Sequence, residues 1–205
     1  MRPAQIAGVI ILVAAAVIGA ATLVFTMTSE EPKVAGALGV SSAVPVGGPF
    51  VMTDHTGRTV TEDMLKDRFT LIYFGYTFCP DVCPTELQDM AVALDLAGEA
   101  AEQVTPVFVT IDPKRDGQEE IAAYVDAFHP RMIGLRGTDA QTTVMAKAYR
   151  VFYQPVEQDG DDEYYLVDHS NFIYLMGPDG RNVAVFNGEV TPDVMAKGIR
   201  QAVEG

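Results

Sequence analysis

Residues 69–84 read FTLIYFGYTFCPDVCP, and this stretch decides the fold. The first seven residues, 69–75, are mostly apolar, aromatic or β-branched, which is typical of a strand buried on both faces. Cys79 and Cys83 follow in a short loop, and apolar residues then recur at helical spacing over residues 85–100. The stretch therefore predicts a buried strand, a loop with two cysteines and a helix in direct succession.

Strands and helices alternate along the rest of the chain. Runs of β-branched and aromatic residues predict strands over residues 104–111, 133–135, 164–167, 172–176 and 183–186, and an upstream hairpin over residues 50–54 and 58–61. Helices are predicted over residues 118–127, over 139–150 behind Thr138 as N-cap, and from Pro192 onward. The acidic residues 155–163 are expected to form an exposed loop or hairpin tip. This order predicts an α/β domain of three layers with a mixed central sheet.

The N-terminus has the pattern of a membrane span. Residues 6–25 form an uncharged apolar run, about as long as a helix needs to be to cross a bilayer. Arg2 precedes the run, whereas Glu30 and Glu31 follow it, so the positive-inside rule places the N-terminus in the cytoplasm. A cleaved signal peptide is the alternative, because small residues at 19–21 could form a processing site.

We therefore expect four parts along the chain. They are a cytoplasmic N-terminus (1–5), a transmembrane anchor (6–26), a flexible tether rich in small residues (27–48) and a folded domain (49–205). This layout fits a single-pass protein of the bacterial inner membrane that carries its domain in the periplasm.

The chain is strongly acidic, with 28 Asp and Glu residues against 14 Lys and Arg residues. Phosphate backbones and anionic headgroups would repel such a surface, so nucleic-acid binding is not expected. A partner with a basic patch would suit the domain best. The alternative is that the acidity serves only solubility.

The chain contains only two cysteines, Cys79 and Cys83. A disulfide that closes so short a loop restricts the unfolded chain little, so stability is a poor reason for the pair. Pro84 suits the first turn of the predicted helix, which puts Cys83 at or beside the N-cap, where the helix dipole favours a thiolate. A thiolate pair of this kind can exchange disulfides or bind a soft metal such as Cu(I).

A third ligand would have to come from elsewhere, and there are three histidines. His55 lies in a predicted turn and His129 precedes a proline at a predicted helix end, so both are expected at the surface. His169 stands just before the apolar strand 172–176, where a mixed sheet can present its side chain to the cysteine loop. Asp168 is a candidate to orient His169, with a solvated side chain as the alternative.

Four motifs resemble the Sco/SenC family of thioredoxin-fold, copper-binding assembly proteins. They are TLIYFGYTFCPDVCPTELQDM at 70–90, VTIDPKRD at 109–116, YLVDHS at 165–170 and LMGPDG at 175–180. The resemblance implies a thioredoxin-like fold and copper ligation by Cys79, Cys83 and His169. It also implies delivery of copper to the binuclear copper site of cytochrome c oxidase subunit II, or reduction of that site's cysteines. An upstream periplasmic copper donor would then be a second partner.

This ligand set makes chemical sense for a carrier. Two thiolates and one imidazole suit Cu(I), and the imidazole lets the site accept Cu(II) as well. Asp81, inside the cysteine loop, could tune the metal or meet a partner, or could simply be a turn residue. The family's DPxRD segment is intact at 112–116 and is expected to fix a loop near the site. Phe78 stands where several family members have His, which leaves the three ligands intact but could alter redox behaviour.

Other functions remain open at this point. A thiol-disulfide oxidoreductase shares the fold and the activated pair, although such proteins usually have two residues between their cysteines and three intervene here. A peroxidase would need a Thr where Tyr76 stands and a Pro where Ile72 stands. A structural zinc site would need four protein ligands.

Overall fold

The computed structural model describes residues 45–156 and 165–205. The predicted cytoplasmic segment and transmembrane anchor lie outside these residues, as do most of the tether and most of the acidic segment 155–163. Among the helices of the described residues, none is both long enough and apolar enough to cross a membrane.

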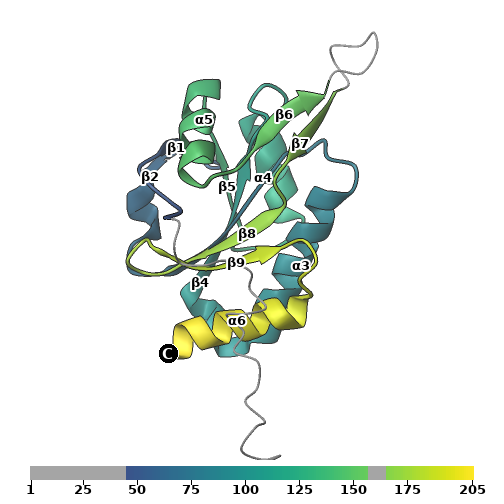
Figure 1. The fold of residues 1–205 in the computed structure, drawn as a ribbon. Coiled ribbons are helices and arrows are strands. Elements are labelled where there is room, and N and C mark those ends of the chain that lie inside the picture. The colour runs from purple at the N-terminus through teal and green to yellow at the C-terminus, as the bar shows by residue number, and fades with distance from the viewer. Residues whose placement is uncertain (1–44, 157–164) are drawn as a thin grey trace, which may run out of the picture. The chain divides into compact units, whose positions relative to one another are not determined.

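A seven-stranded mixed sheet forms the centre of the described domain (Figure 1). Its strands are β1 (Val51–Asp54), β2 (Thr59–Thr61), β3 (Phe69–Gly75), β4 (Val104–Thr110), β5 (Ile133–Arg136), β8 (Phe172–Met176) and β9 (Asn182–Asn187). Their spatial order is β2-β1-β5-β4-β3-β8-β9. The pairs β3–β4 and β4–β5 are parallel, whereas β1 and β8 join antiparallel. The predicted mixed central sheet is confirmed.

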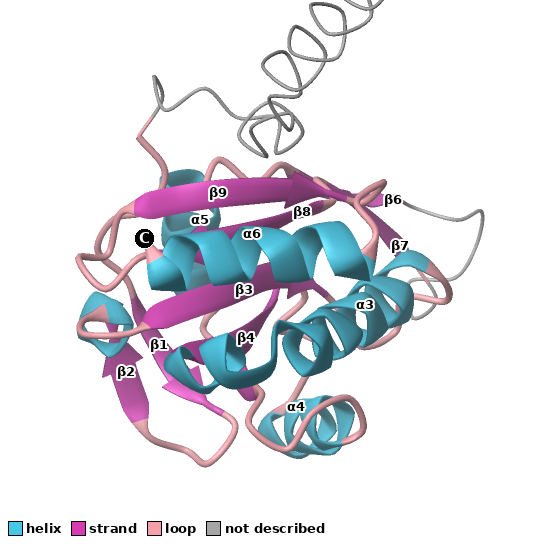
Figure 2. Cartoon of the chain, turned by 90° about the horizontal axis from the view of Figure 1, so that it is seen from below, coloured by secondary structure: helices cyan, strands magenta, loops and turns pink. Residues whose placement is uncertain are grey.

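Helices cover both faces of this sheet. They are α3 (Val82–Ala97), α4 (Gln118–Asp126), α5 (Asp139–Ala148) and α6 (Pro192–Glu204), with short 3-10 helices η1 (Glu62–Leu65) and η2 (Gly98–Gln103). Figure 2 shows α3 and α6 side by side across one face with α4 beside α3, and α5 behind the sheet. The right-handed crossovers β3–α3–β4 and β4–α4–β5 account for α3 and α4 on the same face. The three predicted layers are therefore present.

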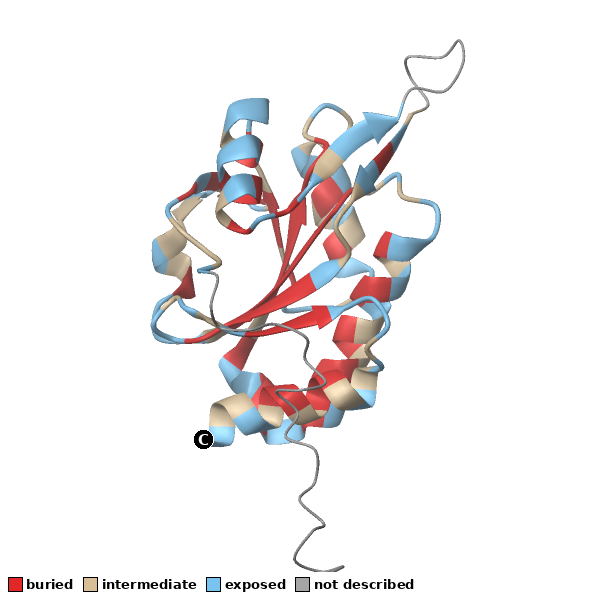
Figure 3. Cartoon of the chain, in the orientation of Figure 1, coloured by how far each residue is buried: buried red, intermediate tan, exposed pale blue. Residues whose placement is uncertain are grey.

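Strand β3 lies at the centre of the hydrophobic core. Every residue from Thr70 to Gly75 is buried, as the continuous apolar run predicts, and the neighbouring strands are buried with it (Figure 3). Phe74 packs against Tyr149 and Tyr174, with ring centroids 5.3 and 6.0 Å away. Burial of each such side chain contributes about 1.5–3 kcal/mol to folding. The cysteine loop therefore leaves a strand that is buried almost throughout its length.

A second, two-stranded sheet stands apart from the central one. Strands β6 (Tyr153–Val156) and β7 (Leu166–His169) pair antiparallel, with Tyr153 opposite His169. Pro155 and Val156, predicted as the start of an exposed loop or hairpin tip, belong to β6, and the rest of that predicted loop lies outside the described residues. The predicted strand 164–167 is displaced: β7 begins at Leu166 and includes His169, because its hydrogen-bonding partner is β6 and not the central sheet.

Two helix boundaries also differ from the sequence prediction. Helix α3 begins at Val82 with Asp81 as N-cap, so Cys83 is the second helical residue. Helix α5 ends at Ala148, before the end predicted at residue 150, because Arg150 adopts a left-handed backbone with φ of 57°. The capping box of Thr138 with Gln141 confirms the predicted start of α5.

Candidate metal centre

The structure brings together the three side chains that the sequence singles out. The ligand atoms of Cys79, Cys83 and His169 all lie within 4.8 Å of one another. His169 Nε2 is 3.4 Å from Cys83 Sγ. Bonds from a first-row metal to sulfur are about 2.3 Å, as zinc sites show, so ligands on opposite sides of an ion lie about 4.6 Å apart. Little movement is needed to close this cluster around one ion.

Helix α3 and strand β3 hold the two thiols. The Cys83 side chain is buried against the end of β3, where a Cβ on Gly75 would lie 2.8 Å from Cys83 Sγ. Only glycine leaves room for the thiol there. Cys79 is partly exposed, and its Sγ accepts a hydrogen bond of 3.4 Å from the Cys83 backbone N–H. The open side of the cluster is therefore at Cys79.

His169 is oriented through its other ring nitrogen. Nδ1 lies 3.0 Å from the Ser170 carbonyl oxygen, to which it can only donate a hydrogen bond. Nδ1 therefore carries a proton, and Nε2, the atom that faces Cys83, is the nitrogen that a metal would use in the neutral imidazole. The rings of Tyr73 and Tyr76 contact the imidazole edge to face, at 6.2 and 6.0 Å between centroids.

The structure gives different roles to the two aspartates that the sequence nominates as helpers. Asp168 is exposed, and no hydrogen bond joins it to His169 in the described part of the chain. The Ser170 carbonyl takes the role predicted for Asp168, because alternate residues of β7 point to opposite sides. Asp81 is an exposed N-cap whose carbonyl accepts a hydrogen bond from the Thr85 hydroxyl. This position agrees with a turn role, and the Asp81 backbone N–H also helps to lower the pKa of Cys79. Contact of its side chain with a partner stays a prediction.

Glu86 and Asn171 connect the helix that carries Cys83 with the segment that follows His169. Glu86 lies one turn after Cys83 on α3 and is buried, and Asn171 Nδ2 donates a 2.8 Å hydrogen bond to its carboxylate. Burial raises the pKa of Glu86. Gly188 accommodates this pair, because a Cβ there would collide with the Asn171 amide. The segment just after His169 is thus attached to the helix that carries Cys83.

The two thiols differ in acidity. A hydrogen bond with Cys83 lowers the pKa of the Cys79 thiol, and contacts with His169 and backbone N–H groups add to this against the effect of burial. The same hydrogen bond, together with burial, raises the pKa of Cys83. The lowered pKa of Cys79 and the raised pKa of Cys83 favour a thiolate at Cys79 beside a protonated Cys83. This is a soft, anionic site that suits a thiophilic metal or disulfide exchange.

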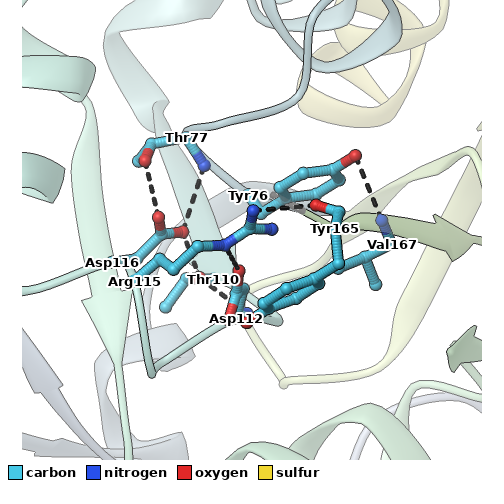
Figure 4. A network of polar contacts seen from close by, with 8 residues as sticks. All are labelled: Tyr76, Thr77, Thr110, Asp112, Arg115, Asp116, Tyr165 and Val167. Carbon is cyan, nitrogen blue, oxygen red and sulfur yellow. Dashed lines mark hydrogen bonds and ion pairs between the residues drawn. The ribbon is translucent and has the colours of Figure 1, made fainter. Parts of the chain in front are cut away.

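The predicted role of the DPxRD segment is confirmed in its geometry. Asp116 is buried and accepts hydrogen bonds from the backbone N–H and the hydroxyl of Thr77, and from the Thr110 hydroxyl (Figure 4). Thr77 stands two residues before Cys79. The segment after β4 therefore fixes the start of the cysteine loop.

The family is decided by a match over most of the chain. A family model described as SCO1/SenC matches residues 39–204. The chain belongs to the SCO1/SenC family. An SCO2-like protein of Rickettsia conorii is 36% identical over 184 residues, 89% of this chain and 90% of that protein. Protein SenC of Rhodobacter capsulatus is 38% identical over 159 residues, 78% of this chain and 71% of that protein.

Solved SCO1/SenC-family structures share the fold. The crystal structure of Arabidopsis thaliana ScoI with copper bound has a TM-score of 0.73 at 39% identity, and the match covers 78% of this chain and 98% of that chain. The thioredoxin-like α/β fold with a mixed central sheet is thereby confirmed.

Several residues around the site were missed by sequence reasoning. Tyr73, Tyr76, Glu86 and Asn171 surround the cluster, but their types and positions read as ordinary core or surface residues. Tyr76, Glu86 and Asn171 each lie within three residues of a predicted ligand, which is the only signal that could have nominated them. His55 and His129 lie apart from the cluster, where they accept hydrogen bonds from the backbone of Gly134 and Arg131.

Proposed function

We propose that this SCO1/SenC-family protein binds one copper ion through Cys79, Cys83 and His169 and passes it to the copper site of a recipient protein. The observation that carries the proposal is the convergence of two thiols and one correctly oriented imidazole in the described residues. Solved relatives that carry copper support the choice of metal. Thiolates select Cu(I), and the imidazole makes the site able to hold Cu(II).

The site is built for release as well as for capture. Three ligands leave the ion under-coordinated, so an incoming ligand from a recipient can attack it without prior loss of a protein ligand. Cys79 is partly exposed, and Phe78 and Val82 beside it are exposed apolar side chains. A partner could approach the ion along this side.

Cytochrome c oxidase subunit II is the recipient that we propose, because the family resemblance implies it and its binuclear site uses soft ligands. The predicted anchor at residues 6–26 and the tether at 27–48 would hold the domain at the outer face of the inner membrane, within reach of a membrane-bound oxidase. A periplasmic copper donor would load the domain upstream. Localisation of the full chain by fractionation and protease protection tests this arrangement.

Copper stoichiometry tests the metal-carrier proposal. We expect the full chain to bind about one Cu(I) under reducing conditions, as a lone three-ligand site would. Binding should be lost in Cys79→Ala and Cys83→Ala and weakened in His169→Ala. His129→Ala is the matched control, because this histidine lies outside the cluster. Unchanged copper binding in both Cys variants would refute the assignment.

A second candidate function rests on the unequal acidity of the two thiols. Cys79 is partly exposed and has the lowered pKa, whereas Cys83 is buried and has the raised pKa, which is the arrangement of an attacking and a resolving cysteine. In this reaction Cys79 Sγ attacks one sulfur of a recipient's disulfide and releases the other as a thiolate. Cys83 Sγ then attacks Cys79 in the mixed disulfide, which leaves the recipient reduced and the pair oxidised. The proposed recipient is the same copper-site protein before metal transfer.

Trapping experiments separate the two functions. With Cys83→Ser, a reductase should accumulate a mixed disulfide with an oxidised recipient peptide, whereas Cys79→Ser should not. If neither variant traps the peptide while the full chain binds copper, the carrier function stands alone.

A further inference from the structure

Arg115 joins three segments of the chain beside the metal cluster. It lies in the loop after β4, and its Nε makes an ion pair with Asp112 at 2.5 Å. Its Nη1 donates a 2.8 Å hydrogen bond to the Tyr165 carbonyl, at the start of the segment that leads into β7. The Tyr165 hydroxyl donates in turn to the second oxygen of Asp112, at 2.7 Å. These three residues close a ring of contacts, which we name the arginine latch (Figure 4).

Aromatic rings surround the guanidinium of the latch. Its carbon lies 3.7 Å from the centre of the Tyr165 ring, and 5.1 and 5.6 Å from the rings of Phe78 and Tyr76. A cation within about 6 Å of a ring face is attracted to it. The Arg115 side chain is only 14% exposed, and its Nη2 is buried without a hydrogen-bond partner among the described residues. The group is therefore held by stacking and by its fork of donors, which a lysine could not reproduce.

The contacts of Arg115 reach the histidine side of the cluster. Tyr165 directly precedes β7, the strand that ends at His169. Tyr76, whose ring faces the guanidinium, accepts a 3.2 Å hydrogen bond from the Val167 N–H in the same strand. The cysteine loop is fixed separately, by Asp116 through Thr77. Arg115 also contacts the cysteine loop through the Phe78 ring, but that loop keeps the Asp116–Thr77 hydrogen bonds when the Arg115 side chain is lost. We therefore expect β7 to lose more of its support than the thiols do.

We propose that Arg115 is a positioning residue that holds β7, and with it His169 Nε2, in reach of the metal. The proposal rests on the copper-binding function proposed above. Two thiolates can hold Cu(I) in a linear arrangement, whereas Cu(II) depends on the nitrogen ligand. The arginine latch therefore sets the affinity for Cu(II) more than that for Cu(I), and through this difference the reduction potential of the bound ion.

The test compares Arg115→Met, Arg115→Lys and Tyr165→Phe with the unaltered full chain. The matched control is Arg131→Met, because Arg131 also donates to two backbone carbonyls, those of Ala101 and Val104, but at the opposite end of β4. Competition titrations measure Cu(I) and Cu(II) affinity separately. Amide hydrogen exchange of Val167 in the metal-free protein gives a readout that needs no copper, and circular dichroism verifies folding.

We expect Arg115→Met to weaken Cu(II) binding by about 10–100-fold, the usual cost of losing a group that orients a ligand. Cu(I) affinity should change within about twofold, as for an ordinary surface substitution. For each tenfold by which the loss of Cu(II) affinity exceeds the loss of Cu(I) affinity, the reduction potential of the bound ion rises by about 59 mV, as for any one-electron couple. Arg115→Lys should rescue Cu(II) binding in part, and Tyr165→Phe should have a smaller effect. Val167 exchange should accelerate most in Arg115→Met and stay unchanged in Arg131→Met.

The outcomes separate this proposal from the underlying function. If the unaltered chain binds no copper, the carrier function fails, and Val167 exchange still decides whether Arg115 holds β7. If the unaltered chain binds both ions and Arg115→Met weakens them equally, the latch does not act through His169 and the proposal is overturned. Equal losses in Arg131→Met would overturn it as well, since general destabilisation would then explain them.

Discussion

The two halves of the metal cluster are built in different ways. Cys79 and Cys83 lie between the central strand β3 and helix α3, where the hydrophobic core itself fixes the backbone. His169 lies at the end of β7, in a two-stranded sheet outside the central one. Side-chain hydrogen bonds hold that strand and its flanks. The Tyr76 hydroxyl accepts from the Val167 N–H, Arg115 donates to the Tyr165 carbonyl, and Asn171 donates to Glu86.

This difference teaches which half of the site is adjustable. The thiol half is anchored in the core through the buried Cys83 and by the Asp116–Thr77 hydrogen bonds, so we expect it to move little. The histidine half depends on a few polar contacts, each worth about 0.5–1.5 kcal/mol, and can shift at small cost. A carrier that must release its ion gains from one firm half and one movable half. Substitutions that disturb the thiol half should therefore weaken Cu(I) binding, whereas substitutions that disturb the histidine half should weaken mainly Cu(II) binding.

The largest effect on copper binding is expected from Gly75→Ala, which displaces Cys83 in the thiol half of the site. The added Cβ would lie 2.8 Å from Cys83 Sγ and 3.0 Å from the Tyr73 ring, so the thiol must move. We expect Cu(I) affinity to fall by about 100-fold, the upper range for disturbing a ligand's support. Gly48→Ala is the control, because its Cβ would meet only Ala148 at an ordinary 3.4 Å. Copper titration with intact Cu(I) binding in Gly75→Ala would show that the thiol half is adjustable too.

The second effect is the pH dependence of Cu(I) binding. The lowered pKa of Cys79 and the raised pKa of Cys83 mean that the metal-free pair keeps one proton near neutrality. Copper must displace that proton, so affinity rises with pH, by about tenfold per unit between about pH 6 and pH 8. Two ordinary thiols would both lose a proton on binding, so their affinity for Cu(I) would rise by about 100-fold per pH unit.

Alkylation provides the metal-free measurement for the same prediction. Iodoacetamide should modify Cys79 at a nearly constant rate across this pH range, while the rate for a model cysteine peptide rises with pH. A rate for Cys79 that follows the peptide would contradict the shared proton.

The firm half was also the half that the sequence predicted best. The run FTLIYFG is a strand with the predicted bounds, and the cysteine loop and helix follow it as expected. Local hydrophobic pattern and helix-start chemistry decide these elements, and both are visible in a short window. The identity of the third ligand was available from the resemblance, and the structure places it beside the thiols.

The movable half was predicted less well, for a physical reason. The strand β7 is short, half exposed and paired with β6 across residues that the pattern shows only as acidic. Its position depends on contacts between Arg115 and Tyr165 and between Glu86 and Asn171, which are far apart in sequence. No periodicity encodes such pairs. The same absence of local signal explains why Asp168 was preferred to the Ser170 carbonyl as partner of His169.

A smaller effect on copper binding is expected from Asn171→Ala, which removes a contact that holds the histidine half of the site. The substitution removes the 2.8 Å hydrogen bond to the buried Glu86 carboxylate and frees the segment after His169. We expect Cu(II) affinity to fall by about tenfold, the lower range for such a support, with Cu(I) affinity nearly unchanged. Competition titrations with both ions measure this. A loss of equal size for Cu(I) would mean that the two halves respond as one body.

The smallest effect on copper is expected from Thr138→Ala, which touches neither half. This change breaks the capping box at the start of α5 and should lower the free energy of unfolding by about 1 kcal/mol. Cu(I) and Cu(II) affinities should both stay within about twofold, as for a distant surface change. Denaturant unfolding and the two titrations measure the pair of outcomes. If Thr138→Ala weakened Cu(II) as much as Asn171→Ala does, the histidine half would be responding to overall stability, and its local contacts would no longer explain its mobility.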